Sequence, residues 1–221
     1  MKKFKRLLFR EFFLSFKNTH SLLICFLFFL LGISIFIISI GNSNIMNLNI
    51  GSSIIWVLFI FTLLLSVEQF FLKDYSDGSL KELVLLGFTS DLIIISKTLT
   101  IWVFLIFPLL LFFPFVGVML GINLKEIYLL LAAIFISSPS LILISIIGTL
   151  ITIQSNSSKI MLTILVLPFV VPIIIFGVGS IEIFFESSKP FQNFFILIAI
   201  FLITLPLTLF VGRIAFKELN N

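Results

Sequence analysis

The sequence is poor in charged residues. Lys, Arg, Asp and Glu together make up 11% of its 221 residues, whereas about 25% is usual for soluble globular domains. Hydrophobic residues make up 60%, and the mean hydropathy is +1.31. A chain this apolar cannot cover its surface with polar side chains, which excludes a water-soluble globular fold. We therefore predict an integral membrane protein, whose helices satisfy their own backbone groups inside the bilayer.

Residues that carry enzyme chemistry are also scarce. The chain has one cysteine, Cys25, and one histidine, His20. This excludes a disulfide, a Cys-based or His-based metal site and bis-histidine haem ligation within a single chain. The sequence also has no G-x-x-x-x-G-K-[ST] phosphate loop. We expect no catalytic residues, no metal site and no covalently bound cofactor, and any ATP hydrolysis must take place on another subunit.

What the sequence does have is long apolar runs. Six are each long enough to cross a hydrocarbon core about 30 Å thick: residues 21–40, 50–72, 98–120, 127–153, 160–180 and 194–212. We expect Pro139, in the fourth run, and Pro168 and Pro172, in the fifth, to kink their helices. The predicted fold is all-α, with six transmembrane helices.

The basic residues predict the orientation. Six of the fourteen Lys and Arg residues lie in the first 17 positions, ahead of an apolar run, which is typical of a membrane flank and not of a nucleic-acid-binding surface. With both termini in the cytoplasm, twelve of the fourteen lie inside and only Lys125 and Lys189 outside. Basic and apolar residues at helical spacing in 1–20 predict an amphipathic helix in the membrane interface, the alternative being a flank without fixed structure.

These features predict a single membrane domain over residues 1–221. Its expected parts are an interfacial helix (1–20), spans one and two (21–72), a cytoplasmic loop (73–97), spans three and four (98–153), spans five and six (160–212) and a cytoplasmic tail (213–221).

The loop after span two concentrates charge in the stretch LKDYSDGSLKELVLLG (72–87). Within it, "SLKE" has the form of a capping box, in which Ser79 caps a helix and Glu82 reaches back to the cap's own N–H. Asp77 and Gly78 are turn residues, and Gly87 is placed to end the helix. The pattern predicts a helix of about two turns.

Leu80, Leu83 and Val84 would lie on one face of this short helix. A helix of two turns is marginal alone in water, so this face must pack either against the chain's own helix ends or against a partner. The alternative is a solvated loop with a capped turn. We expect Glu68, near the end of span two, to be a functional or structural pairing site, since a carboxylate at this depth is costly without a partner; the alternative is an interfacial acid that reaches water.

Three stretches resemble the CcmB family of ABC-2-type permeases. They are IIWV (54–57), EQFFLKDYSDGSLKELVLL (68–86) and ILVLPFVVPIIIFG (164–177). The second is similar to the family's D-G-S-L element and the third to its paired prolines. Span number, span order and length agree over essentially the whole chain.

The resemblance implies a transport subunit and not an enzyme, namely the haem exporter B permease of the cytochrome c maturation system. It implies ATP bound by a separate CcmA-like ATPase, CcmC-like and CcmD-like membrane partners, and haem delivered indirectly to a CcmE-like chaperone outside the membrane. A homodimer in the bacterial inner (plasma) membrane is expected, with the mitochondrial inner membrane as the alternative. Whether haem itself passes through this subunit, or the subunit only transmits ATP-driven motion, is left open.

Under this resemblance the short helix becomes the coupling element. Asp77, Gly78, Ser79 and Glu82 would shape it; Leu80, Leu83 and Val84 would contact the ATPase; and Glu68, Lys73 and Asp74 would anchor it to neighbouring helix ends. Three rival functions stay open: an ABC-2 permease for a lipid, polysaccharide or drug, a non-transporting scaffold of the maturation complex, and a secondary carrier.

Overall fold

The protein is built from helices that continue beyond the apolar runs of the sequence. A computed structural model describes residues 2–17, 19–40, 48–154, 159–186 and 191–218, and these contain no strand. The helices in chain order are α1 (Lys2–Lys17), α2 (Thr19–Ile40), α3 (Leu48–Ser76), α4 (Ser79–Leu85), α5 (Ser90–Ile101), the π-helical turn η1 (Trp102–Ile106), α6 (Phe107–Met119), α7 (Leu124–Gln154), α8 (Lys159–Glu186) and α9 (Gln192–Glu218).

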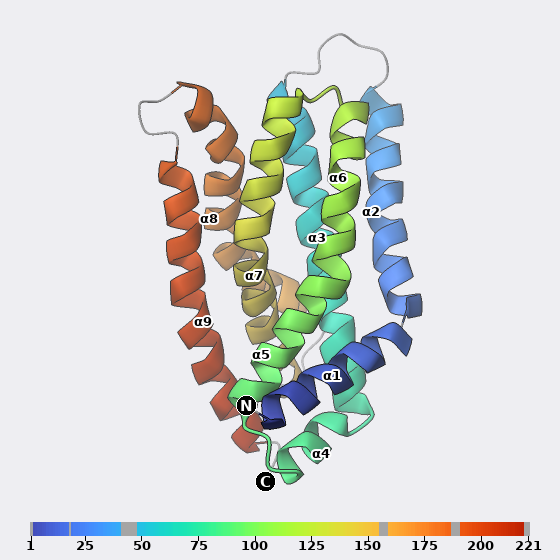
Figure 1. Ribbon diagram of the computed structural model, residues 1–221, viewed down its shortest axis with the longest axis vertical. Coiled ribbons are helices and arrows are strands. Elements are labelled where there is room, and N and C mark those ends of the chain that lie inside the picture. Colours follow the sequence, from blue (N-terminus) through green and yellow to red (C-terminus); the bar gives the residue numbers. More distant parts are fainter. Residues whose placement is uncertain (1, 18, 41–47, 155–158, 187–190, 219–221) are drawn as a thin grey trace.

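The long helices run side by side along one axis, with α5, η1 and α6 forming one continuous helical path (Figure 1). Helix α7 packs against α3, α6, α8 and α9, and α2 packs mainly against α3. The short helices α1 and α4 lie at one end of the bundle, where α1 crosses below the long helices and packs against α5 (Figure 1). Helix α9 ends at this same end (Figure 1).

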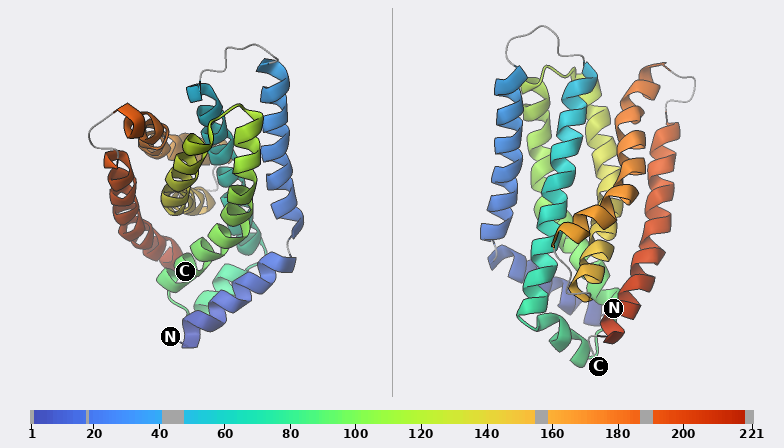
Figure 2. Two further views of the ribbon diagram at one scale, coloured as in Figure 1. Left: turned by 45° about the horizontal axis from the view of Figure 1, so that its top comes forward. Right: turned by 180° about the vertical axis from the view of Figure 1, so that it is seen from behind.

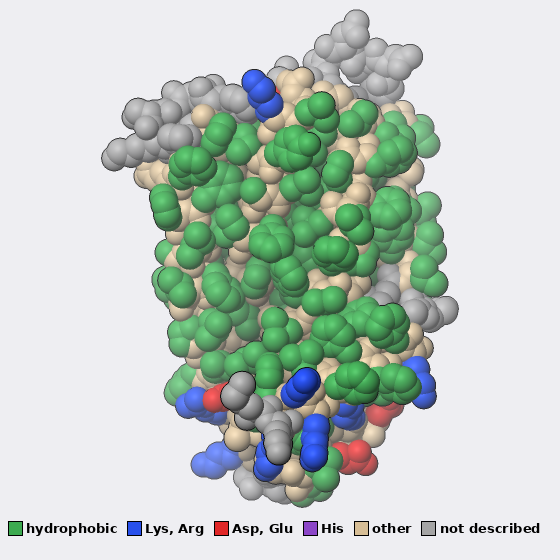
Figure 3. Space-filling model, viewed as in Figure 1, with side chains coloured by type: hydrophobic (Ala, Val, Ile, Leu, Met, Phe, Trp, Pro, Cys, Tyr) green, Lys and Arg blue, Asp and Glu red, His purple; other side chains and the backbone are tan. Residues whose placement is uncertain are grey.

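Four helical stretches are long and apolar enough to cross a membrane. They are Ile50–Ser76, Ser90–Met119, Leu124–Thr152 and Gln192–Lys217, and shorter apolar helices cover Leu23–Ser39 and Val166–Ile181 among the described residues. Figure 3 shows hydrophobic side chains over most of the visible face, and charged side chains gathered at the end where α1 and α4 lie. An all-helical membrane protein is therefore confirmed, while the count of six spans stays a prediction.

Helices extend into the segment that is expected to form the cytoplasmic loop at 73–97. Helix α3 continues to Ser76 and α5 begins at Ser90, so only residues 77–89, which contain α4, separate the two. The expected tail from residue 213 is likewise helical as far as Glu218. Hydropathy shows where apolar side chains end, whereas the backbone hydrogen-bond ladder of a helix continues through polar residues.

The bundle accommodates its prolines through local hydrogen bonds. Pro139 has no N–H to donate to the carbonyl of Phe135, and the Ser138 hydroxyl donates to that carbonyl instead, at 3.0 Å. Ahead of Pro108 the chain forms the π-turn η1, in which the Phe107 N–H donates to the Trp102 carbonyl.

Near Pro139 a hydrogen bond joins two helices, and the prolines of α8 lie inside that helix. The indole N–H of Trp102 donates to the hydroxyl of Ser138 at 2.9 Å, which ties η1 to α7 beside Pro139. Helix α8 holds Pro168 and Pro172 in its interior and bends part-way along its length (Figure 2).

Candidate functional site

The turn before α4 is formed by glycine and backbone hydrogen bonds. Gly78 is the N-cap residue with φ 72°, and no side chain caps the helix. The Ser79 hydroxyl donates to the Asp74 carbonyl at 3.2 Å, which places it back on the end of α3. The predicted capping box between Ser79 and Glu82 is therefore wrong. Ser79 is already the first helical residue, and a left-handed residue such as Gly78 turns the chain without a side-chain cap.

The end of α4 is as predicted. Gly87 has φ 79°, its N–H donates to the Val84 carbonyl at 2.9 Å, and the Phe88 N–H donates to the Leu83 carbonyl at 3.2 Å. This pair of bonds is a Schellman motif, in which a left-handed glycine satisfies the last carbonyls of a helix. Gly87 therefore ends α4.

The apolar face of α4 points into the protein. Leu80 and Leu83 are each 1% exposed, and Val84 is half-buried against the same core. Leu85 and Leu86, in contrast, are 73% and 70% exposed. The prediction that a partner contacts Leu80 and Leu83 is therefore wrong, because these side chains already pack against this chain's own helices. The exposed apolar side chains of α4 and its C-terminal end are Leu85 and Leu86.

A buried cation joins three helices next to α4. Lys97 of α5 is 3% exposed, and its ammonium donates to Glu11 of α1 at 3.0 Å and to Asp74 of α3. Arg10 pairs with the other oxygen of Glu11 at 2.7 Å, and the Lys97 ammonium lies 5.5 Å from the ring centroid of Phe71. Asp74 therefore ties the end of α3 to α5 and α1, through a lysine and a glutamate that the sequence reasoning did not select, while its predicted role in anchoring α4 stays a prediction.

A second ion pair links the same end of the bundle to α9. Arg213 donates to both carboxylate oxygens of Asp91, with Nε 2.9 Å from Oδ1 and an NH2 group 2.6 Å from Oδ2. The pair ties the first turn of α5 to the last turns of α9. Because the Arg213 side chain is 64% exposed, water screens this ion pair, and we expect the pair to contribute little to stability.

Two other expected anchors lie on α3. Glu68 is half-buried and Lys73 is exposed, and their role in holding α4 stays a prediction. Glu11 is the single acidic residue in an otherwise basic α1, and Lys97 is a lone cation at the start of an apolar run. These exceptions to the local pattern were a signal that could have singled out the two residues, although it does not state that they meet.

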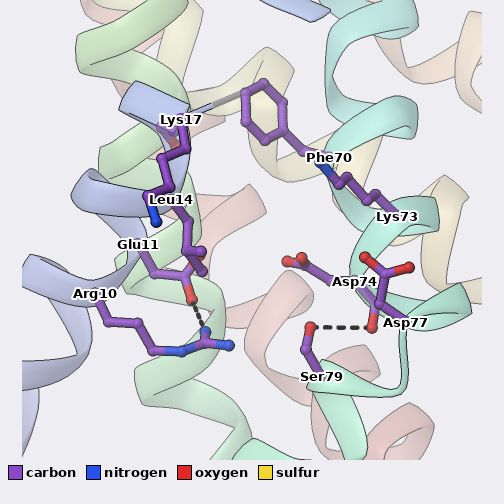
Figure 4. Close-up of a pocket in the computed structure, with 10 residues that line it drawn as sticks. Arg10, Glu11, Leu14, Lys17, Phe70, Lys73, Asp74, Asp77 and Ser79 are labelled. Carbon is purple, nitrogen blue, oxygen red and sulfur yellow. Dashed lines mark hydrogen bonds and ion pairs between the residues drawn. The ribbon is translucent and has the colours of Figure 1, made fainter. Parts of the chain in front are cut away.

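A cavity of about 300 Å³ separates α1 from the end of α3 and the turn before α4 (Figure 4). Its charged and polar lining comes from α1 on one side and from α3 and the turn on the other: Arg10, Glu11, Ser15, Lys17, Lys73, Asp74, Asp77 and Ser79. Among the described residues, His, Cys, Asp and Glu form no cluster of three that could hold a metal ion. The candidate site therefore consists of the ion pairs of Lys97 and of the exposed Leu85 and Leu86, all at one end of the bundle.

Buried contacts connect the elements at this end of the bundle. Leu80 and Leu83 seat α4 on the protein core, and Lys97 connects α3, α5 and α1. Helix α4 packs against α3, so the end of α3 links α4 to the buried ion pairs.

The chain is similar in sequence to proteins of one family. A family model described as "CcmB protein" matches residues 2–218. The chain is 30% identical over 179 residues to "Heme exporter protein B" of Pseudomonas aeruginosa, a match that covers 81% of this chain and 80% of the relative.

Two further relatives carry the same name. The Haemophilus influenzae protein is 30% identical over 155 residues, covering 70% of each chain. The Paracoccus denitrificans protein is 28% identical over 190 residues, covering 86% of this chain and 87% of the relative. The family model spans nearly the whole chain, from α1 to the end of α9, and this protein is therefore a member of the CcmB family.

Proposed function

We propose that this protein is the permease subunit of an ABC transporter that supports haem export for the maturation of c-type cytochromes. The observation that carries the proposal is its membership of a family whose relatives are named heme exporter protein B. The apolar helices support a place in a bacterial membrane. The lack of a phosphate loop in the sequence supports ATP hydrolysis on a separate, CcmA-like subunit.

In this proposal six helices cross the plasma membrane and both termini lie in the cytoplasm. Two copies of the chain face two ATPase subunits, beside CcmC-like and CcmD-like proteins, and haem reaches a CcmE-like chaperone on the other side. His20 is the chain's one histidine and belongs to the first turn of α2. A subunit without further histidines is better suited to transmitting ATP-driven motion than to ligating haem along a path.

The ATPase contact is proposed at α4, with Asp77, Gly78, Ser79 and Glu82 shaping and orienting it. Leu85 and Leu86 are the apolar side chains that α4 and its C-terminal end present to the outside, and exposed apolar side chains rimmed by charge are typical of contact sites. Leu80, Leu83 and Val84 act from the inner side. They hold α4 against the bundle, so that a movement of the ATPase displaces the bundle together with α4.

The first test concerns this contact. The double variant Leu85→Glu/Leu86→Glu should still insert in the membrane and should lose co-purification of the ATPase, because two charges replace the apolar contact. A matched control is Leu124→Glu/Tyr128→Glu, which alters two exposed side chains at the start of α7 and should retain the ATPase. Retention of the ATPase by the α4 variant at wild-type yield would place the contact elsewhere.

The second arm concerns the transported species. Deletion of the protein should remove all c-type cytochromes detected by haem staining, and the wild-type gene should restore them. If an ATPase co-purifies but the cytochromes persist, the protein is a permease for another substrate, such as a lipid, polysaccharide or drug. If the cytochromes are lost but no ATPase binds, it is a scaffold of the maturation complex.

A further inference from the structure

Helix α1 carries positive charge on its surface that no acid of the same helix balances. It contains six basic residues and one acidic residue, Glu11. Glu11 is 5% exposed and binds the buried Lys97, so its carboxylate is turned away from the surface. Four of the bases are exposed: Lys3, Lys5, Arg6 and Lys17. The salt bridges in the described part of the chain involve none of these four.

The same helix exposes large aromatic side chains. Phe9, Phe13 and Phe16 are 75%, 54% and 67% exposed. A groove of about 500 Å³ runs along this face, and its lining is apolar apart from Lys5. The ammonium of Lys17 lies 4.9 Å from the ring centroid of Phe13. Exposed aromatic and basic side chains therefore adjoin on α1.

The aromatic face of α1 continues into the apolar surface of the bundle. The rings of Phe12 and Phe16 pack edge to face against Phe104 of η1, with centroids 5.2 and 4.8 Å apart. Phe16 and Phe104 also line a second apolar cavity, together with Leu23 and Phe26 of α2. Since α1 crosses the charged end of the bundle (Figure 1), this continuity places its rings at the edge of the hydrocarbon core.

The bases of α1 repeat at helical spacing along one edge. Arg6 follows Lys3 after three residues, Arg10 follows after four more, and Lys17 after seven more, which brings these side chains to the same side of a helix. The buried residues of α1 lie on another side: Leu7, Glu11 and Ser15. Helix α1 thus has a buried, an aromatic and a basic side, as expected for a helix that lies in a membrane interface.

We propose that the exposed side of α1 binds anionic phospholipids of the surrounding bilayer. Its bases lie in the headgroup layer and attract lipids of net negative charge, while its phenylalanines insert among the acyl chains. The phenylalanines alone would not distinguish one headgroup from another. The lipid class is selected by the unbalanced bases, because a single Lys or Arg near an anionic surface accounts for about a fivefold gain in affinity.

The experiment measures which lipid lies next to α1 in the full chain. In a Cys25→Ser background, Phe9→Cys carries a small apolar fluorophore, and the protein is placed in vesicles of equal parts phosphatidylcholine and phosphatidylglycerol with identical acyl chains. One of the two lipids is brominated, so that it quenches the label on contact. Brominated phosphatidylglycerol should quench at least about fivefold more strongly than brominated phosphatidylcholine. High salt should lower this ratio, because it screens exposed charges.

Two matched variants separate α1 from the general charge of this end of the bundle. Lys3→Gln/Arg6→Gln should lower the quenching ratio at least about twofold, because two bases of the edge are lost. Lys81→Gln/Lys217→Gln removes the same charge from exposed lysines of α4 and α9 and should leave the ratio unchanged.

Three results would overturn the proposal. Equal quenching by the two lipids would show that α1 lies in the bilayer without selecting a headgroup. Quenching by neither lipid would show that its aromatic face is outside the bilayer and is open to a protein partner. An equal fall of the ratio in both double variants would assign the preference to overall charge. The measurement uses neither haem nor ATP, so its outcome is independent of the proposed transport function.

Discussion

Lys97 lies near the beginning of a long apolar helix, with its ammonium enclosed by the carboxylates of Glu11 and Asp74. The side chain is 3% exposed, so its charge has little access to water. Removing one member of such a buried group leaves the opposite charges without compensation, which costs more than the pair itself contributes.

We therefore expect Lys97→Met to destabilise the protein by about 3–5 kcal/mol, measured by thermal unfolding of the purified chain in detergent. The matched control is Arg213→Gln, which breaks the exposed pair with Asp91 and should cost much less, because water screens an exposed pair. Adding Glu11→Gln to Lys97→Met should restore part of the loss, because one uncompensated carboxylate is removed. Equal effects of Lys97→Met and Arg213→Gln would show that the buried group is unimportant.

At the scale of elements, α4 is held by its two ends and by its inner face. Leu80 and Leu83 fasten it to the core, and glycines with positive φ lie immediately before it and two residues past its end. A Cβ added at Gly87 would meet no atom within 4 Å. The cost of a substitution there is therefore the backbone conformation alone.

We expect Gly87→Ala to lower the stability of α4 by about 1–2 kcal/mol, because a left-handed φ is unfavourable for residues with a Cβ. Gly87→Asn should lose less, since asparagine tolerates this conformation. Hydrogen exchange of the α4 amides would measure both, with the amides of α7 as the internal reference. Similar exchange in the wild type and in Gly87→Ala would contradict the role of the left-handed turn.

At the scale of the whole molecule, charge is distributed unevenly along the bundle axis (Figure 3). Basic residues that flank membrane helices remain on the cytoplasmic side. The end that carries α1 and α4 is therefore expected to face the cytoplasm, and the turn before α7 the opposite side.

Cysteine labelling in intact cells tests this orientation. In a Cys25→Ser background, Lys125→Cys should react with a membrane-impermeant maleimide, and Lys81→Cys should react only after the cells are opened. Both positions are exposed on the protein surface, so a difference between them reports the side of the membrane. The reverse labelling pattern would invert the topology.

Much of the architecture is predictable from local sequence. The apolar runs mark the membrane helices because bilayer thickness sets their length, and Gly87 marks the end of α4 because few other residues adopt its conformation. The resemblance at 68–86 led to the family that the whole-chain match shows. These features depend on composition, spacing and single-residue conformation.

The contacts at the end of the bundle were not predictable in this way. Glu11 and Lys97 are 86 residues apart in the chain, and no local pattern states that they meet. The short helix illustrates the same limit, since the spacing of Leu80 and Leu83 predicts an apolar face but not what covers it.

The sequence by itself therefore determined a helical membrane protein, its charged end and the existence of α4. Only the tertiary structure decided that α4 turns its leucine face inward, exposes Leu85 and Leu86, and stands beside a buried lysine that joins three helices. The physical reason is that helix formation and membrane insertion depend on neighbouring residues and on the bilayer, whereas burial and charge pairing depend on which distant segments pack together.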